Sequence, residues 1–220
     1  MNRRPALLAV AALTTAAALS LSACGGGDGD SKSDDKIEGA GSTASEKPSP
    51  SASEAADRSD RPKVDMPKGV SNVFEGGSTG DAKKDAVLED NARNLDAIDV
   101  AITVGGKSSQ KALKFYNSGK ALIATASYIQ GYYDDGKSYI GATRYYDRQV
   151  TFHGASEATV TYCADATKTY PKDRKTGKVD RSIPASANDY TFFNERLKKN
   201  AKGVWQSVDV LSETGAKKCM

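Results

Sequence analysis

The chain has 220 residues, and 31 lysines and arginines against 28 aspartates and glutamates give a formal net charge of +3. It contains no internal repeat and no second hydrophobic span after its N-terminal apolar run, which argues against repeat and multi-spanning architectures. A single histidine and three cysteines supply no set of side chains that stands out as a metal centre or a catalytic triad.

The first segment, residues 1–23, has the features of a secretory signal peptide. Arg3 and Arg4 form a basic start, an Ala- and Leu-rich run extends to Leu21, and small residues precede Cys24. The sequence Leu21-Ser22-Ala23-Cys24 resembles the lipobox of bacterial lipoproteins. This resemblance implies that the Cys24 thiol receives a diacylglyceryl group and that the chain is cleaved just before Cys24. Two acyl chains are the physical minimum for stable anchoring.

Two other interpretations of this N-terminus stay open. An ordinary signal peptide can carry a cysteine near its cleavage site by chance, and the apolar run can remain as a membrane span. The run is only just long enough to span, it is rich in Ala rather than Leu, and Gly and Asp residues follow Cys24 directly. We therefore predict a lipid-anchored protein on the extracytoplasmic face of the cell membrane.

Residues 24–79 form the next segment, which we predict to be a disordered linker behind the lipidated cysteine. From residue 25 to 62 the chain consists mostly of Ser, Ala, Gly, Asp, Glu, Lys and Pro, with Ile37 as the only large aliphatic residue. Such a segment buries too little apolar surface to offset the chain entropy lost on folding. The stretch that follows is still rich in Gly, Pro and Ser, so we place the start of a folded domain at residue 80 and its end at residue 220.

The two remaining cysteines agree with export. With Cys24 lipidated, Cys163 and Cys219 form an even pair in a secreted domain, and this predicts a disulfide. The alternative is a reactive thiol, but a cysteine nucleophile needs a nearby base and the only histidine is His153.

Helical periodicity dominates the first half of the domain. Asp81 can cap a helix whose apolar positions run to residue 102, and the glycines at 105 and 106 end it. Ser108 or Ser109 can cap a short second helix that ends before Asn117. A third helix is expected from residue 120 to about 133.

The second half shows short, aromatic and β-branched runs separated by polar turns. The expected strands are 139–146, 149–153, 158–164, 189–197 and 204–211, with a charged loop tip at 171–177. In the third strand Val160 and Tyr162 face one side of the sheet while Cys163 faces the other. Helices followed by antiparallel strands predict an α+β domain, with the N-terminal helices packed on one face of a curved antiparallel sheet.

The order of these elements is similar to the cone-shaped fold of the nuclear transport factor 2-like superfamily, which includes ketosteroid isomerase and SnoaL-like cyclases. More closely, five segments resemble a group of uncharacterised lipoproteins of high-GC Gram-positive bacteria: 121–132, 160–165, 176–179, 203–206 and the terminal Cys219. These motifs concern turns, a tryptophan strand and a cysteine pair, so they imply a fold rather than a chemistry. No catalytic residue is carried over from the superfamily.

One segment matches a nucleotide-binding pattern by spacing alone. Residues 131–138 fit the phosphate-loop pattern, which functions where a strand leads into a loop that opens into a helix. Here a helix precedes the segment and a strand follows it, and Asp134 and Asp135 would repel phosphates. We interpret the segment as a helix-to-strand turn with a left-handed Gly136. We predict no bound nucleotide, no nucleic acid, no metal, no other cofactor and no catalytic residue.

Aromatic side chains are the most suggestive feature of the domain. In a cone-shaped fold they can line a concave pocket for a small apolar or glycan ligand, although they can equally form the core and its rim. The candidate pocket residues are Tyr128, Tyr132, Tyr145, Tyr162, Phe193 and Trp205. Basic residues cluster at 172–175, at 198–202 and at 217–218, where they can contact anionic wall polymers or lipid head groups, or can simply be solvated turns.

The function predicted from the sequence is that of a membrane-anchored extracytoplasmic lipoprotein with a non-enzymatic binding or interaction module. Its partners are the membrane, reached through the lipid anchor, and a cell-wall polymer or an envelope protein. The alternatives are a carrier of a small apolar or glycan ligand and an isomerase- or cyclase-like enzyme that uses the concave aromatic pocket. An enzyme needs a buried Asp or Glu with a raised pKa near a tyrosine in that pocket.

Overall fold

The computed structural model describes residues 60–220. The signal peptide 1–23, the lipidation site Cys24 and the linker up to residue 59 lie outside the described residues, so these expectations remain predictions. Among residues 60–220, no helix combines the length and the apolar character needed to cross a lipid bilayer.

Three helices follow one another in the first half of the domain: α2 (Ala82–Thr103), α3 (Lys107–Tyr116) and α4 (Gly119–Asp134). Asp81 caps α2 as predicted, and its carboxylate accepts hydrogen bonds from the backbone amides of Lys83 and Lys84. The predicted serine cap of α3 is wrong. Gly106 precedes that helix with φ 95° and provides no side-chain cap, while Ser109 donates back to the Gly106 carbonyl.

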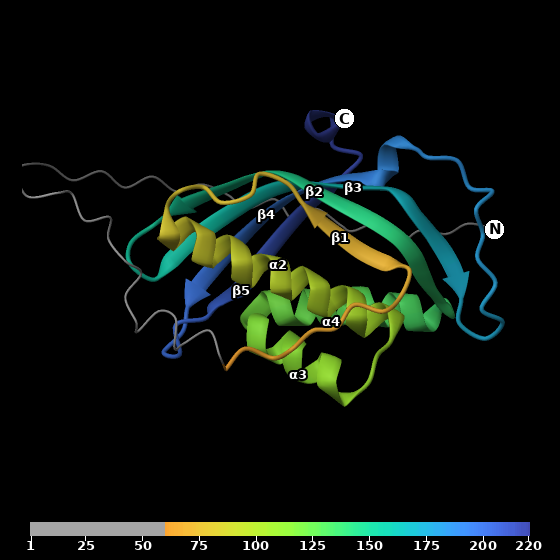
Figure 1. Ribbon diagram of the computed structural model, residues 1–220, viewed down its shortest axis with the longest axis horizontal. Helices are drawn as coiled ribbons and strands as arrows, with labels where there is room; N and C mark the ends of the chain where they lie inside the picture. The colour runs from red at the N-terminus through yellow and green to blue at the C-terminus, as the bar shows by residue number, and fades with distance from the viewer. Residues whose placement is uncertain (1–59) are drawn as a thin grey trace, which may run out of the picture. The chain divides into compact units, whose positions relative to one another are not determined.

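The sheet has five strands in the order β1-β2-β3-β4-β5. Their bounds are Val70–Phe74, Lys137–Phe152, Glu157–Asp173, Tyr190–Lys199 and Trp205–Thr214. The predicted α+β class, with helices preceding most strands and packing on one face of a curved sheet, is confirmed (Figure 1). The sheet is not wholly antiparallel, because β1 pairs with β2 in the parallel direction.

Strand β1 lies within the range that the sequence assigns to the linker. It is short, and glycines and prolines surround it, so its composition resembles that of a linker. Its partner on β2 is distant in sequence, with Val70 opposite Gly141 and Phe74 opposite Tyr145. The ordered structure therefore begins before residue 80.

The predicted strands 139–146 and 149–153 are one long strand, β2. Asp147 has φ 51°, and the register with β3 shifts between Tyr146 and Gln149. This irregularity has the character of a β-bulge, which bends a strand and increases its twist without ending it. β3 is also longer than predicted, since Pro171 pairs with Tyr139 inside the sheet.

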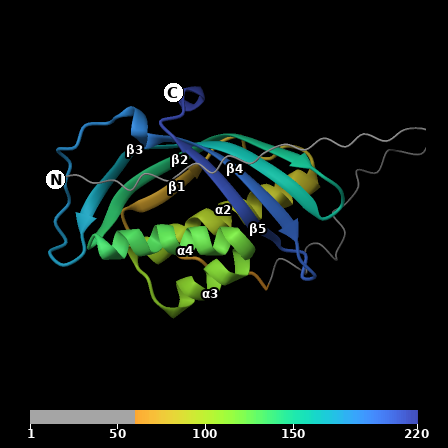
Figure 2. The ribbon, with the colours of Figure 1, turned by 180° about the vertical axis from the view of Figure 1, so that it is seen from behind.

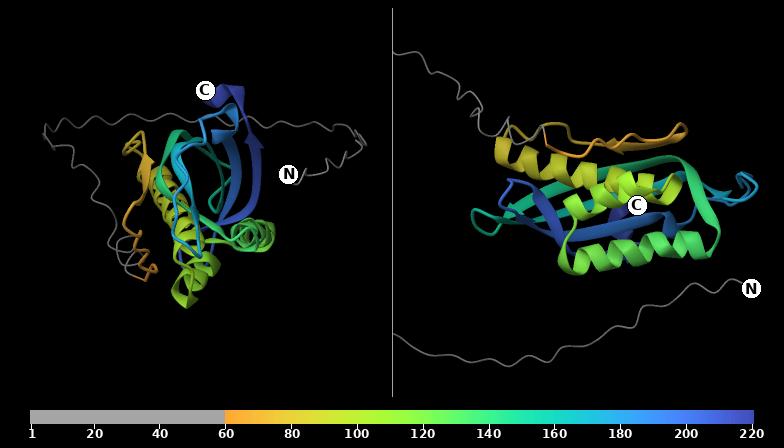
Figure 3. Two further views of the ribbon diagram at one scale, coloured as in Figure 1. Left: turned by 90° about the vertical axis from the view of Figure 1, so that its right-hand side faces the viewer. Right: turned by 90° about the horizontal axis from the view of Figure 1, so that it is seen from below.

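The helices and the concave side of the sheet enclose the core (Figures 1 and 2). One buried cluster joins α2 to the middle of the sheet and includes Leu88, Leu95 and Tyr162. A second cluster joins α2, α3 and α4 and includes Ile102 and Tyr116. Viewed from below, α2, α3 and α4 lie in front of the sheet (Figure 3, right).

The segment just before β1 is attached to the helical layer. Arg61 forms two hydrogen bonds with Asp90 of α2, at 2.5 Å from Nε and 2.9 Å from Nη2. Val64 packs against the second buried cluster, and Gly69 accepts a hydrogen bond from the Gly141 amide at 2.7 Å. The chain is thus held to the domain from residue 61 onward.

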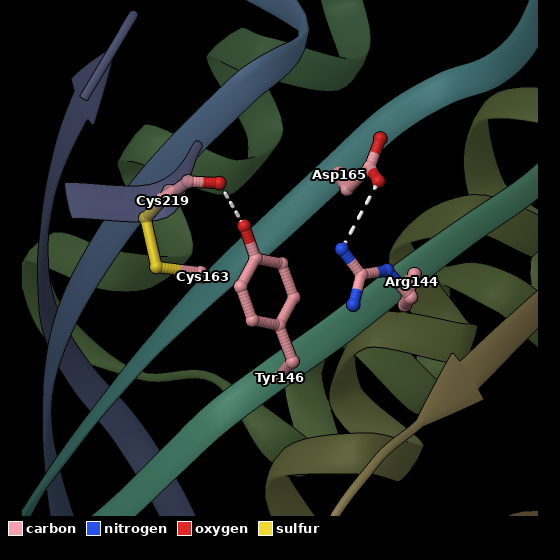
Figure 4. Close-up of a disulfide and its surroundings, with 5 residues drawn as sticks. All are labelled: Arg144, Tyr146, Cys163, Asp165 and Cys219. Atoms are coloured by element: carbon pink, nitrogen blue, oxygen red, sulfur yellow. Dashed lines mark hydrogen bonds and ion pairs between the residues drawn. A yellow bond between two sulfur atoms is a disulfide. The ribbon is translucent and has the colours of Figure 1, made fainter. Parts of the chain in front are cut away.

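The opposite face of the sheet carries a smaller cluster around the disulfide (Figure 4). Cys163 on β3 and Cys219 in the 3-10 turn η2 (Lys217–Cys219) are joined by a disulfide, with their Cα atoms 5.5 Å apart. Tyr146 donates a hydrogen bond to the Cys219 carbonyl, and Phe192 packs against the same cluster. The disulfide therefore fastens the end of the chain to the middle of the sheet.

Candidate functional site

Four of the six candidate pocket residues belong to the core. Tyr145, Tyr162 and Trp205 are buried in the cluster between α2 and the sheet, and Phe193 packs against that cluster. The rings of Tyr162 and Phe193 are stacked at 5.0 Å, and those of Tyr145 and Tyr162 meet edge to face at 5.9 Å. These side chains pack on one another.

The other two candidate residues, Tyr128 and Tyr132, lie one turn apart on α4. Their hydroxyl oxygens are 3.3 Å apart and their rings meet edge to face at 5.4 Å. Helical spacing places both on the same side of α4 as the buried Ala121 and Thr125. Tyr128 nevertheless remains 56% exposed. Solvent therefore reaches an aromatic side chain on the inner side of this helix.

A buried carboxyl group lies beyond Tyr132. The ring of Tyr132 contacts that of Tyr139 on β2 at 5.6 Å between centroids. The Tyr139 hydroxyl donates a hydrogen bond to the Asp99 carboxyl group on α2. Asn72 of β1 donates from the same amide nitrogen to Asp99 Oδ2 at 2.6 Å and to Asp96 Oδ1 at 2.8 Å. The candidate site thus draws on α2, α4, β1 and β2.

Burial raises the pKa of Asp99 to about 6, although the hydrogen bonds from Tyr139 and Asn72 favour the charged form and oppose the shift. Burial likewise raises the pKa of Asp96. The pKa values of Tyr132 and Tyr139 are raised by burial first and by the nearby Asp99 charge as well. The phenols therefore keep their protons at neutral pH and act as hydrogen-bond donors, while Asp99 can change its charge near neutral pH.

A second buried carboxyl group lies inside the core. Glu195 on β4 accepts hydrogen bonds from the Tyr162 hydroxyl at 3.0 Å and from Asn91 Nδ2 at 2.9 Å. Burial raises the pKa of Glu195 to about 7. Arg148 approaches the same network and donates to Asn91 Oδ1 at 3.2 Å. Because its partners are core residues, this group is structural and forms no part of the candidate site.

Apart from Tyr132, which lies within residues 131–138, the remaining sequence candidates take no part in this site. Residues 131–138 contain the end of α4 and the start of β2, with Gly136 at φ 62°, as the turn interpretation predicts. His153 is exposed, and its Nε2 lies 2.8 Å from Thr159 Oγ1. Within residues 60–220, no group of three or more His, Cys, Asp or Glu side chains is placed to hold a metal ion.

Two open hollows lie along β1, β2 and β3. One of about 510 Å³ is lined by residues that include Val70, Gly141 and Tyr170. The other, of about 230 Å³, includes Val73 and Arg144. Their lining includes none of the six candidate aromatic residues. Both are therefore separate from the tyrosine and aspartate network.

The sequence contains a signal that Asp99 is buried, but the signal is easy to overlook because Asp99 is polar. Asn91 and Asp99 lie four residues before and after Leu95, at the spacing of the apolar stripe of α2. Polar residues at such positions are buried with the stripe. The residue that joins them to β1, Asn72, gives no comparable signal because the strand itself was missed.

No protein-family model matches the chain, and no curated protein matches it. Among solved structures, it is similar to a ketosteroid isomerase-like protein from Erwinia carotovora atroseptica, with 15% identity and a TM-score of 0.43 over 61% of this chain and 97% of that one. It is also similar to the intermembrane space region of the chloroplast protein ARC6, with 13% identity and a TM-score of 0.38 over 62% of this chain and 99% of that one. A de novo designed β-sheet protein gives 14% identity and a TM-score of 0.32 over 60% and 92% of the two chains. These likenesses concern the path of the backbone, and no ligand or reaction is transferred from them.

Proposed function

We propose that the chain is a lipid-anchored lipoprotein on the extracytoplasmic face of the cell membrane, and that its domain is a non-enzymatic module that binds a small ligand. Anchoring is supported by Leu21-Ser22-Ala23-Cys24 after a signal-like segment. The disulfide between Cys163 and Cys219 supports export, because disulfides persist in oxidising compartments.

Mass spectrometry of the native protein tests the anchor. The expected product begins at Cys24 and carries a diacylglyceryl group, and a Cys24→Ser variant is expected to lose this mass and to leave the membrane fraction. A native product in which residue 24 is unmodified would overturn the anchoring proposal and leave the binding proposal to its own test.

The observation that carries the binding proposal is the exposure of Tyr128 on the inner side of α4. Its hydroxyl lies 3.3 Å from that of Tyr132. One phenol donates to the other in this pair, and the accepting phenol keeps its own hydrogen for a ligand held against the rings. An aromatic surface with a few polar groups suits a small, largely apolar molecule that carries hydrogen-bond acceptors. A glycan can use the same combination of ring face and hydroxyl.

Binding is tested with the neutral fluorophore Nile red as the apolar probe and chitobiose as the glycan probe. Saturable binding of either probe, and its loss in Tyr128→Ala, is expected. The matched control is Ile123→Ala, which removes a 70% exposed apolar side chain from the outer side of the same helix. Equal loss in both variants, or no saturable binding of either probe, would contradict the proposal.

An isomerase-like enzyme is the second candidate, and Asp99 favours it. The raised pKa of about 6 suits a carboxyl group that exchanges protons with a carbon acid near neutral pH. Whether Asp99 can exchange a proton with a bound ketone is tested by NMR, which follows deuterium exchange at the carbon next to the carbonyl group of a cyclic ketone. Exchange above the buffer rate that disappears in Asp99→Asn would support the enzyme, and exchange at the buffer rate would leave the binding module.

A further inference from the structure

Helix α3 and the start of α4 differ sharply in charge from helix α2. Between Asp99 and Asp134 the chain contains four lysines and no acidic residue. The lysines are Lys107, Lys111, Lys114 and Lys120. The preceding helix, α2, carries five acidic residues against three basic ones. The net positive charge of the helical layer therefore lies at α3 and the start of α4.

The lysines of α3 share one face of that helix. Lys107, Lys111 and Lys114 follow the spacing i, i+4 and i+7, and all three are exposed. The opposite face carries Ala112 and Tyr116, which are buried in the core. None of the four lysines forms an ion pair with a residue in the described part of the chain. Their charges are thus directed to solvent without a neutralising partner there.

Exposed apolar side chains accompany these lysines. Val104, at the end of α2 and just before α3, is 60% exposed, and Ile123 on α4 is 70% exposed. The face of α4 that contains Ile123 has no charged residue between Lys120 and Asp134. We call Val104, Lys107, Lys111, Lys114, Lys120 and Ile123 the basic face. Helix α3 lies on the side of the helical layer away from the sheet (Figures 1 and 3), and helical spacing places its lysines opposite its buried residues. By the same spacing, Ile123 lies on the side of α4 opposite the buried Ala121.

The entry of the linker into the domain is close to this face. Val64 packs against the buried cluster that contains Leu113 and Tyr116 of α3. Arg61, which precedes it, is held by Asp90. Figures 1 and 3 show the first described residues at the same lower end of the molecule as α3. A lipid anchor at Cys24 would therefore be connected to the domain at a point near its basic face.

We propose that the basic face docks on the surface of an anionic lipid bilayer. Lysines attract anionic head groups, and apolar side chains such as Ile123 can enter the interface between head groups and acyl chains. A soluble anionic polymer would use the charges but has no apolar phase for Val104 and Ile123. The choice of a membrane as occupant rests on the proposed anchor, which keeps the domain within reach of a bilayer. The test below does not need the anchor.

The experiment uses the chain from residue 24 onward with Cys24→Ser, which carries no lipid. Its sedimentation is measured with vesicles of equal parts phosphatidylglycerol and phosphatidylcholine, and with vesicles of phosphatidylcholine alone. Binding to the anionic vesicles only is expected. Replacing Lys107, Lys111 and Lys114 by Gln is expected to weaken that binding about 100-fold. The three lysines contribute binding free energies of similar size at an anionic surface, and all three contributions are lost together. Ile123→Ser is expected to weaken it further.

The matched control removes the same charge from β3 and the turn after it, with Lys168, Lys175 and Lys178 replaced by Gln. If the two triple variants lose binding equally, the protein binds anionic vesicles through its net charge and not through the basic face, and the proposal is wrong. Poly(glycerol phosphate) added as a competitor tests whether the basic face binds an anionic wall polymer in place of a membrane. Complete displacement at an equal phosphate concentration, with no effect of Ile123→Ser, would assign the face to an anionic wall polymer. Since the protein used here has no lipid, failure of this test does not bear on lipidation of Cys24.

Discussion

Arg61 and Asp90 form an ion pair that is almost completely removed from water. Two hydrogen bonds join the guanidinium and carboxylate groups, at 2.5 and 2.9 Å, and the side chains are only 4% and 0% exposed. Asp90 also accepts a hydrogen bond from the Trp205 amide at 3.0 Å. The pair therefore connects the segment before β1 with α2 and with the start of β5.

Loss of Arg61 is expected to destabilise the domain strongly. Arg61→Ala leaves the Asp90 carboxylate buried without its cation, and breaking such a pair typically costs about 3–5 kcal/mol. Chemical denaturation followed by tryptophan fluorescence measures this loss. The charge-neutral control is the double variant Arg61→Met with Asp90→Asn, which leaves no isolated charge and is expected to recover much of the stability. Equal losses in the two variants would contradict this explanation.

The Arg61 contact lies in the region where the sequence alone places the start of the folded domain too late. Helix α2 could be predicted because its cap, Asp81, and its apolar spacing are local signals. Strand β1 could not, since its parallel pairing with β2 depends on residues far away in the chain. Similarly, the bulge at Asp147 is decided by pairing with β3, so a polar pair of residues within β2 was interpreted as a turn.

Raising the pH from 4.5 to 7 is expected to lower the free energy of unfolding. Burial raises the pKa of Glu195 from 4.5 to about 7, so in this range the folded protein retains a proton that the unfolded chain releases. Stability therefore falls as pH rises and levels off above pH 7. The shift corresponds to roughly 3 kcal/mol, and Asp99, with its pKa raised to about 6, acts in the same direction.

The measurement is a series of urea denaturation curves across this pH range, with Glu195→Gln as the comparison. Gln keeps a side chain that can hydrogen-bond to Tyr162 and Asn91 but does not titrate. The variant is expected to show a flatter profile, with the slope due to Asp99 remaining. An unchanged profile in Glu195→Gln would mean that Glu195 does not govern the pH dependence.

Part of the candidate site was predictable and part was not. Tyr128 and Tyr132 could be named as candidates because aromatic residues of the helices and the sheet can line the concave side of a cone-shaped fold. The prediction grouped them with Tyr145 and Tyr162, which the fold instead places in the packed core. Which of several inward aromatic residues retains contact with solvent is decided by helix packing, and this is not encoded in local spacing.

Reduction of the disulfide is expected to lower stability without altering the candidate site. Cys163 and Cys219 are separated by 56 residues, and the chain-entropy model assigns about 4 kcal/mol to a loop of this length. Calorimetry should show a lower unfolding temperature for the reduced protein, and a Cys163→Ser, Cys219→Ser double variant should match it. Identical unfolding temperatures in the oxidised and reduced proteins would contradict the expectation.

Gly105 is expected to tolerate no side chain because of two separate constraints. Its φ of 76° disfavours other residues, and a Cβ atom there would meet the Tyr133 hydroxyl, which donates to the Ala101 carbonyl at 2.8 Å. Gly105→Ala should therefore cost about 1–3 kcal/mol. Gly106→Ala is the matched control, because Gly106 has φ 95° but no neighbouring atom within 4 Å of its added Cβ. Denaturation midpoints of both variants are measured in the wild-type background and in a Tyr133→Phe background. The comparison separates the cost of the backbone angle from the cost of the contact with the Tyr133 hydroxyl. The clash predicts that Tyr133→Phe reduces the Gly105→Ala penalty and leaves the Gly106→Ala penalty unchanged, whereas equal penalties in both backgrounds would attribute the whole effect to backbone strain.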